Sequence, residues 1–432
     1  MNAQRPDVHR EPFIHLADLA ADRALVAWGA FWFTRQPGDR WQIVDDERLT
    51  EVAGRRSSIG HRAEPYGTAQ VQLLDPDGAV LHEVVATDRT WAWLTGLAPD
   101  TEYRYRVLVD GEEWAAGELW DWVASPRGGF DLVPHGRRYD LRFRTWPDPD
   151  EPSPRVRFAA LGDYGVGIRS DSESSRRQRR IAEVLERAVE EHQVRSWSRS
   201  VTTSTGASSA GNHDASDTEG SDDREQLEDN FHISERFDSE TDQASVGPGL
   251  FYRRRFGRDL ELVCLDTSLD SQDPAVHRLF QAPHHHAWLE RVFRADSPRW
   301  LVPFSHHPVY CAGPHHPNDE EMQESLLPLF ERAGVRLVLA GHEHNFQVSE
   351  ADGRSYVISG AGGKIREDVP TGFAEACTTA WAAQSHLLLV DIDGEEARLT
   401  PVSGLRADGT MQPMTALAPD DAVRYPPFVV RA

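Results

Sequence analysis

Cysteine is scarce in this 432-residue chain, and the positions of the three that occur exclude two classes of structure. Cys264, Cys311 and Cys377 are scattered, and no pair has Cys-x-x-Cys spacing. A disulfide framework requires several paired cysteines, and a zinc–thiolate site requires closely spaced ones. We therefore expect neither.

Long hydrophobic runs are also missing. The N-terminal residues 1–7 are polar, and no apolar segment typical of a signal peptide follows them. No stretch approaches the roughly 20 apolar residues that cross a bilayer. The sequence therefore predicts a cytoplasmic protein without a membrane partner.

Positive charge is scarce as well. Lysine occurs once, at Lys364, and the 46 Lys and Arg residues are outnumbered by 70 Asp and Glu residues, for a formal net charge of −24. Such a chain is repelled by nucleic acid and by anionic membranes, so we expect neither as a partner. An anionic substrate would have to be attracted locally, for example by a bound metal.

What is present suggests two domains, as the length favours. Residues 12–146 contain short alternating apolar runs, Asp-Gly turns and most of the tryptophans, which predicts a two-sheet β-sandwich. Its segment 94–107 resembles the late-strand signature of fibronectin type III-like domains, and we expect a structural or positioning role. A Pro-rich linker at 147–154 leads to a second domain at 155–410, and 411–432 is expected as a C-terminal tail.

The second domain alternates strand-like runs with helical periodicity, which predicts an α/β (α+β) fold. Apolar residues have helical spacing within 181–189 and 322–330, the latter behind a cap at Asn318 or Asp319. The expected strands are 260–265, 300–304, 335–339, 356–359, 387–392 and 397–402. Strands joined by helices form parallel or mixed sheets, with sites at strand C-terminal ends.

Histidine and oxygen side chains follow several of these strands. In Gly341-His342-Glu343-His344-Asn345, the two histidines leave an extended chain on the same side. Gly162-Asp163-Tyr164-Gly165, Gly211-Asn212-His213-Asp214 and Ser305-His306-His307-Pro308 carry the same residue types. Imidazole is the commonest metal ligand near neutral pH. Packing alone does not require such a set, so we predict one metal site.

These motifs resemble those of the purple acid phosphatases, a branch of the calcineurin-like metallophosphoesterases, over nearly the whole chain. Four of the family's five motifs, DxG, GNH(D/E), VxxH and GHxH, are recognisable. The resemblance implies a fibronectin-like domain followed by a two-sheet αββα catalytic domain. It also implies two metal ions, iron plus a divalent metal such as Zn, Mn or Fe.

The resemblance further implies which residues bind these metals. Asp163 and His344 match ligands of the first, usually ferric, ion, while Asn212, His306 and His342 match ligands of the second. The implied activity is hydrolysis of a small-molecule phosphate ester by metal-bound hydroxide.

Two substrate-facing residues are implied in the same way. His213 would support protonation of the leaving alkoxide, and His315 lies where such enzymes often keep another histidine. His316 could serve in place of His315, and His307 remains an alternative to His306.

The fifth motif, GDxxY, is missing. In the family it supplies an aspartate that bridges both metals and a tyrosinate ligand. The chain instead has a polar tract at 196–210, and only five residues separate Thr205 from Gly211, too few for a crossover between parallel strands. We therefore expect weak or mononuclear metal binding and impaired hydrolysis.

A reading-frame slip would explain the tract. If its serines have TCN codons, the frame that starts at the third base of each codon permits Gly-Asp-Asn-Ile-Tyr across 200–205, after apolar residues suited to a strand. The nucleotide sequence across 195–211 tests this hypothesis.

Two alternative functions remain open. One is a phosphodiesterase of the same superfamily, which a panel of phosphate esters would distinguish. The other is a catalytically inactive protein of this fold, which the 196–210 tract favours. Two further motifs are interpreted structurally: His284-His285-His286 as the exposed first turn of a helix, and Gly360–Lys364 as a tight turn near the metal rim.

Overall fold

The computed structural model describes most of the chain. The described residues are 8–44, 67–164, 171–192, 251–268 and 278–432. The predicted site residues Asn212 and His213 lie outside them, and so does the tract 196–210.

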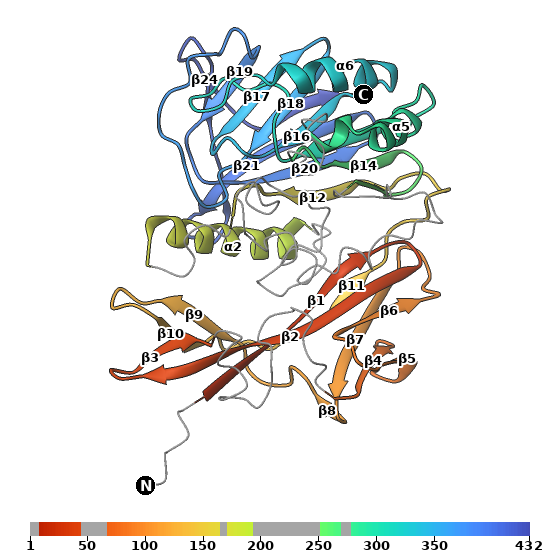
Figure 1. Cartoon of the computed structure of the whole chain (residues 1–432), viewed down its shortest axis with the longest axis vertical. Helices are drawn as coiled ribbons and strands as arrows, with labels where there is room; N and C mark the ends of the chain where they lie inside the picture. The colour runs from red at the N-terminus through yellow and green to blue at the C-terminus, as the bar shows by residue number, and fades with distance from the viewer. Residues whose placement is uncertain (1–7, 45–66, 165–170, 193–250, 269–277) are drawn as a thin grey trace.

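The N-terminal part consists of two antiparallel sheets, shown in the lower half of Figure 1. The first has the order β1-β2-β3-β10-β9, with β6 paired to β2; its strands are β1 (Val8–Leu19), β2 (Arg23–Gln36), β3 (Arg40–Ile43), β6 (Trp91–Thr95), β9 (Trp120–Ala124) and β10 (Phe130–Pro134). The second has the order β11-β7-β4-β5, with β8 paired to β7; its strands are β4 (Ala69–Leu74), β5 (Val80–Ala86), β7 (Glu102–Val109), β8 (Glu112–Glu113) and β11 (Arg142–Arg144).

Alternating burial explains how these sheets pack. In β7, Tyr105, Val107 and Val109 are buried while the residues between them are partly exposed, as expected for a strand with one face in a core. The buried indole of Trp114 donates a hydrogen bond to the carbonyl of Gly29 at 2.9 Å, which satisfies its polar atom in the core. The predicted two-sheet architecture is present, whereas the fibronectin type remains a prediction.

The C-terminal part contains a mixed sheet and an antiparallel sheet. The mixed sheet has the order β13-β14-β15-β16-β18-β17-β19-β23-β24; its strands are β13 (Tyr252–Arg255), β14 (Leu260–Leu265), β15 (Trp300–Ser305), β16 (Leu337–Ala340), β17 (Phe346–Ala351), β18 (Arg354–Ser359), β19 (Thr378–Ala382), β23 (Ala416–Leu417) and β24 (Val423–Arg424). The antiparallel sheet has the order β12-β20-β21-β22, with β25 paired to β21; its strands are β12 (Val156–Ala160), β20 (Leu387–Asp393), β21 (Glu396–Leu405), β22 (Met411–Pro413) and β25 (Phe428–Arg431). Every expected strand is present, with ends within three residues of the prediction.

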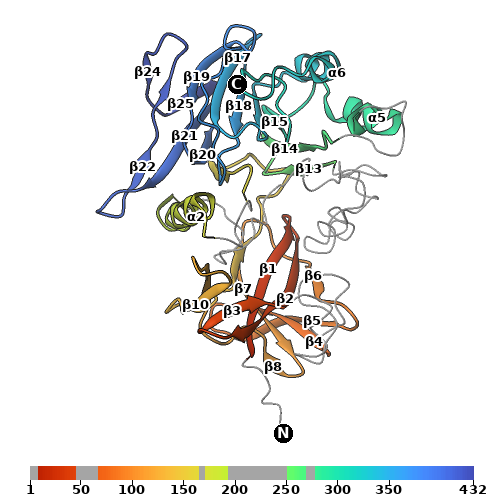
Figure 2. The same cartoon turned by 60° about the vertical axis from the view of Figure 1, so that its left-hand side comes forward.

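Among the described residues, three helices cover the outer faces of these sheets, as Figures 1 and 2 show. On α2 (Glu173–His192), Ile181 and Val184 pack against the antiparallel sheet. On the mixed sheet lie α5 (Pro283–Val292), preceded by the 3-10 turn η2 (Leu279–Gln281), and α6 (Glu320–Arg332). A shared core fills the space between the two sheets. The layers are therefore α, β, β, α, which confirms the predicted fold class.

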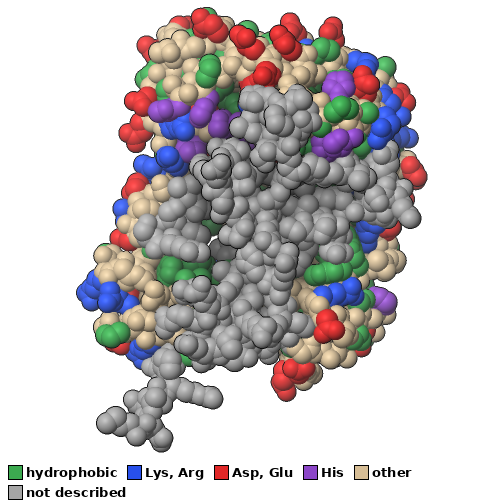
Figure 3. Space-filling view, in the orientation of Figure 1, with side chains coloured by type: hydrophobic (Ala, Val, Ile, Leu, Met, Phe, Trp, Pro, Cys, Tyr) green, Lys and Arg blue, Asp and Glu red, His purple; other side chains and the backbone are tan. Residues whose placement is uncertain are grey.

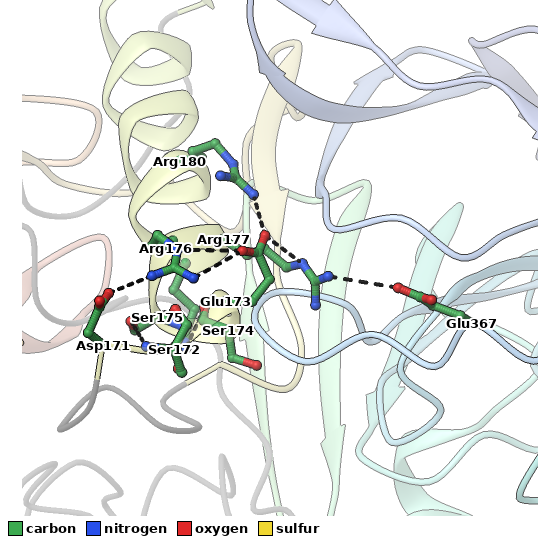
Figure 4. Close-up of polar contacts among 10 residues, drawn as sticks. Asp171, Ser172, Glu173, Ser174, Ser175, Arg176, Arg177, Arg180 and Glu367 are labelled. Atoms are coloured by element: carbon green, nitrogen blue, oxygen red, sulfur yellow. Dashed lines mark hydrogen bonds and ion pairs between the residues drawn. The ribbon is translucent and has the colours of Figure 1, made fainter. Parts of the chain in front are cut away.

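The N-terminal end of α2 has a local hydrogen-bond pattern that explains where this helix begins. The backbone N–H of Ser175 donates to the Ser172 hydroxyl at 3.1 Å, and the N–H of Ser172 donates to the Ser175 hydroxyl at 3.2 Å (Figure 4). One turn further on, Arg177 lies between Glu173, at 3.5 Å, and Glu367, at 3.9 Å. The second contact joins the helix to the loop that follows β18.

Two sequence expectations require comment. His284-His285-His286 is in the first turn of α5, but His285 is fully buried, with its ring stacked on Phe251 at 4.0 Å, so the expectation that this turn is exposed was wrong for that residue. The segment 411–432, expected as a tail, contributes β22 and β25 to one sheet and β23 and β24 to the other. Within the described residues, no helix has the length and apolar character needed to cross a membrane.

Candidate metal centre

The predicted ligands emerge where the two C-terminal sheets meet. Asp163 follows β12 of the antiparallel sheet, whereas His306 follows β15 and His342 follows β16 of the mixed sheet. The parallel pairing of β15 with β16, which places Ser305 opposite Ala340, brings the ends of these strands together. A hydrogen bond from Gly162 N–H to the carbonyl of Ser359, at 2.9 Å, joins the end of β12 to β18.

Four of the predicted metal ligands are in mutual contact. The backbone N–H of His342 donates to Asp163 Oδ2 at 2.7 Å, and His344 Nε2 lies 3.6 Å from Asp163 Oδ1. His342 Nδ1 and His306 Nε2 are 3.0 Å apart. The structure thus presents two facing pairs of donor atoms, Asp163 with His344 and His306 with His342.

Glycines make room for the Asp163 carboxylate. A Cβ atom on either Gly341 or Gly360 would lie 2.8 Å from Asp163 Oδ2, closer than real Cβ atoms approach. Asp163 and His342 themselves have positive φ angles, of 53° and 68°. Such backbone strain is concentrated at functional sites, because the surrounding structure must maintain it.

Burial lowers the pKa of two imidazoles in the cluster, those of His342 and His307. Burial, followed by the charges of His306 and His316, lowers the pKa of His342 to about 3. Burial also lowers the pKa of His307 below its ordinary value. For Asp163, burial raises the pKa, but the contact with His344 and the charges of His306 and His344 outweigh it and hold the pKa below normal. Neutral imidazole and ionised carboxylate are the forms that bind metal.

His307 also belongs to the cluster. Single donor atoms of His306, His307 and His342 all lie within 4.8 Å of one another. Nδ1 of His307 lies 2.9 Å from the Thr267 hydroxyl. His307 therefore stays an alternative ligand, with Thr267 orienting its ring.

The structure separates the two candidate substrate-facing histidines of the 313–317 loop. The ring of His316 lies 4.0 Å from that of His342, centroid to centroid. His315 instead has a half-exposed side chain, with Asp368 as its charged neighbour at 3.7 Å. The cluster therefore contacts His316, and His315 is not brought into it.

Two charged residues beside the cluster were not identified from the sequence. Glu343, between the two histidines of GHxH, is fully buried, and its carboxylate accepts a hydrogen bond from His316 N–H at 3.2 Å. The same carboxylate contacts Arg366 Nη1, which lies 3.3 Å from both oxygens. The sequence could have indicated Glu343 through its position between two candidate ligands. No sequence pattern indicates Arg366.

The residues present fit a metal centre. Within the described part of the chain, the buried Nδ1 of His344 has no hydrogen-bond partner, so this ring has unused binding capacity. Imidazole nitrogens together with a carboxylate form a donor set that suits zinc and iron. Two donor atoms that bind the same ion, each about 2.1 Å from it, are expected to lie roughly 3–3.6 Å apart. The donor atoms of both facing pairs lie at such a distance from each other.

Comparison with known proteins shows similarity to one family. The family model described as calcineurin-like phosphoesterase matches residues 158–346. Asp163, His306, His342 and His344 all lie inside that segment. The match covers somewhat less than half of the chain. The curated relatives that match include a tartrate-resistant acid phosphatase and a purple acid phosphatase.

Two relatives show how far the similarity in sequence extends. Tartrate-resistant acid phosphatase type 5 of Oryctolagus cuniculus is 29% identical over 147 residues, which cover 29% of this chain and 45% of the relative. Purple acid phosphatase 17 of Arabidopsis thaliana is 36% identical over 78 residues, which cover 18% of this chain and 23% of the relative. The chain thus spans about half the length of these relatives or less.

Solved structures extend the likeness in fold to nearly the whole chain. A purple acid phosphatase from yellow lupin (Lupinus luteus) seeds has a TM-score of 0.55 at 14% identity, covering 94% of this chain and 74% of its own. The structure of PhoD has a TM-score of 0.56 at 10% identity, covering 95% and 91%. The chain therefore shares the overall fold of these two structures.

Proposed function

We propose that this protein is a metal-dependent phosphatase that hydrolyses small phosphate esters. The observation that carries the proposal is the convergence of Asp163, His306, His342 and His344, which belong to two different sheets, on one place. The match of residues 158–346 to the calcineurin-like phosphoesterase model supports phosphoester hydrolysis as the reaction class.

The described residues divide into two half-sites. Asp163 and His344 would hold one metal, and His306 and His342 the other, with Asn212 as a further ligand outside the described residues. When bound, two metals would supply Lewis acidity to the phosphate and an activated water. His316 lies beside the second half-site, where it would orient a substrate oxygen.

Impaired activity is part of the proposal. The sequence lacks the GDxxY motif, so the carboxylate that bridges both metals and the tyrosinate have no counterpart. Less negative charge would then separate two neighbouring cations, and the second metal would bind more weakly. We expect fewer than two tightly bound metals per chain and slow turnover. The gene sequence across 195–211 tests whether a reading-frame slip removed the motif.

Metal content and phosphate release, measured on the same purified chain, test the proposal. Asp163→Asn keeps the shape of the side chain but removes the charge, so we expect metal loss and a fall in phosphate release of at least about 100-fold. Asp368→Asn is the matched control, because this exposed carboxylate lies near His315 but outside the cluster. If Asp163→Asn retains metal and rate, the assignment is wrong.

The inactive alternative has its own signature. A folded wild-type chain that binds no added metal and releases no phosphate from any ester would support a non-catalytic protein. Hydrolysis of diesters in preference to monoesters would support the phosphodiesterase alternative.

A further inference from the structure

Arg366 lies next to the metal centre, and neither the sequence motifs nor the family comparison assigns it a role. Its backbone N–H donates to the carbonyl of His344 at 3.0 Å, which ties its loop to a candidate ligand. Its side chain is 19% exposed, so the guanidinium is partly accessible from solvent.

A buried carboxylate orients this guanidinium. Glu343 has no exposed side-chain surface, and both of its oxygens lie 3.3 Å from Arg366 Nη1. Since a buried carboxylate without a partner is costly, the pair constrains the side chain of Arg366. Only Nη1 is used: among the described residues, Nη2 and Nε of Arg366 have no hydrogen-bond partner.

The same carboxylate connects Arg366 to the histidine cluster. Glu343 accepts a hydrogen bond from His316 N–H at 3.2 Å, and the His316 ring lies on that of His342. Arg366 is close enough that its positive charge, after burial, helps to lower the pKa of His316 to about 4. Figure 3 shows histidine side chains gathered with basic side chains on one face of the C-terminal part.

The overall charge makes a local cation important. At a net charge of −24, the molecule repels a phosphate dianion except where cations gather. A guanidinium with two unused donor nitrogens matches the oxygens of phosphate in geometry and charge. A monoester carries one more negative charge than a diester and has one more free oxygen to bind.

We propose that Arg366, oriented by Glu343, binds non-bridging oxygens of the substrate phosphate and makes the site selective for monoesters over diesters. This inference rests on the proposed function, of which it names the substrate class. The alternative is a purely structural ion pair between Glu343 and Arg366.

The test compares variants of the full-length chain on one monoester and one diester. Arg366→Gln is expected to lower the monoester-to-diester ratio of kcat/KM about tenfold or more, mainly through KM for the monoester. Arg366→Lys keeps the charge but not the fork and should retain part of the ratio. Lys364→Gln removes an exposed cation from the same loop. Its monoester-to-diester ratio of kcat/KM should stay within about twofold of wild type.

Two outcomes overturn the inference. One is an unchanged ratio in Arg366→Gln with unchanged metal content, as a structural pair would give. The other is an equal loss in Lys364→Gln, which would indicate a general charge effect.

A binding measurement separates this inference from the proposed function. If the wild-type chain hydrolyses no ester, the proposed function fails, and calorimetric titration with inorganic phosphate decides the role of Arg366. Weaker binding by about tenfold in Arg366→Gln sustains it, and equal binding refutes it. If wild type hydrolyses esters but Arg366→Gln changes neither ratio nor binding, only the inference fails.

Discussion

Single residues in this protein occupy positions where their chemistry is determined by burial. His386 is fully buried between the two C-terminal sheets: its Nδ1 lies 2.9 Å from the carbonyl of Gln384, and its Nε2 lies 3.0 Å from the Ser359 hydroxyl. A neutral ring satisfies both contacts, as donor at Nδ1 and acceptor at Nε2. Burial lowers the pKa of His386 to about 4, despite the opposing effect of the carbonyl.

The lowered pKa of His386 predicts a pH dependence of stability. Between pH 6.5 and 4 the unfolded chain binds a proton at His386 while the folded chain does not. The contribution of the neutral ring to the free energy of unfolding is therefore complete above pH 6.5 and declines as the pH falls toward 4. The loss reaches up to about 3 kcal/mol. His386→Gln should unfold more easily at pH 7 but lose less stability between pH 7 and 4 than wild type, measured by urea unfolding. Equal losses in the two proteins would contradict this.

At the scale of elements, helix starts are explained by particular side chains. The carboxylate of Asp319 accepts a hydrogen bond from Met322 N–H at 2.9 Å, and so caps α6. Its other oxygen accepts from Arg278 Nη2 at 2.5 Å, which joins α6 to the turn before α5. The sequence left Asn318 and Asp319 as alternative caps. Asn318 instead accepts from Cys311 N–H, at 2.9 Å, so it supports the loop rather than the helix.

Asp319 therefore has two separable roles. Asp319→Ala should lower the free energy of unfolding by about 1–2 kcal/mol for the cap and further for the unpaired Arg278. Asp319→Asn keeps an oxygen for the cap but weakens the ion pair, so it should cost less. Thermal and urea unfolding would measure both; equal effects would show that the cap contributes nothing.

At the scale of the whole molecule, a buried ion pair joins the N-terminal sandwich to the C-terminal domain. Arg254 Nη2 of β13 lies 2.6 Å from Asp18 Oδ2 of β1, and both side chains are about 95% buried. Beside them, Trp146 stacks on Phe256 at 4.0 Å. Figure 2 shows the two parts adjoining through this region. The sandwich is thus held in place relative to the candidate metal centre.

Removal of one partner should uncouple the two parts. Asp18→Ala leaves a buried guanidinium without its carboxylate, so we expect a loss of about 3–5 kcal/mol and separate unfolding transitions in calorimetry. The double variant Asp18→Ala/Arg254→Met also removes the guanidinium and should recover most of the loss. If the double variant is no better than Asp18→Ala, a buried charge is not the cause.

Much of this protein followed from the sequence, because periodicity and strand-end motifs are local properties. The strand positions, the α/β class and the predicted ligands Asp163, His306, His342 and His344 were readable as short patterns. The sequence did not show which of two adjacent histidines faces the cluster. Whether His315 or His316 turns toward His342 depends on how the 313–317 loop packs on Glu343.

Only the tertiary structure joined the sequence-distant groups. Asp163 comes from one sheet and the histidines from another, and their contact depends on how the glycines at 162, 341 and 360 let the sheets approach. Arg366 and Glu343 form a pair across 23 residues, which no local pattern specifies. Which side chains could bind metal was determined by the residues themselves; which of them share one centre was decided by packing, since distance in space is a property of the folded core.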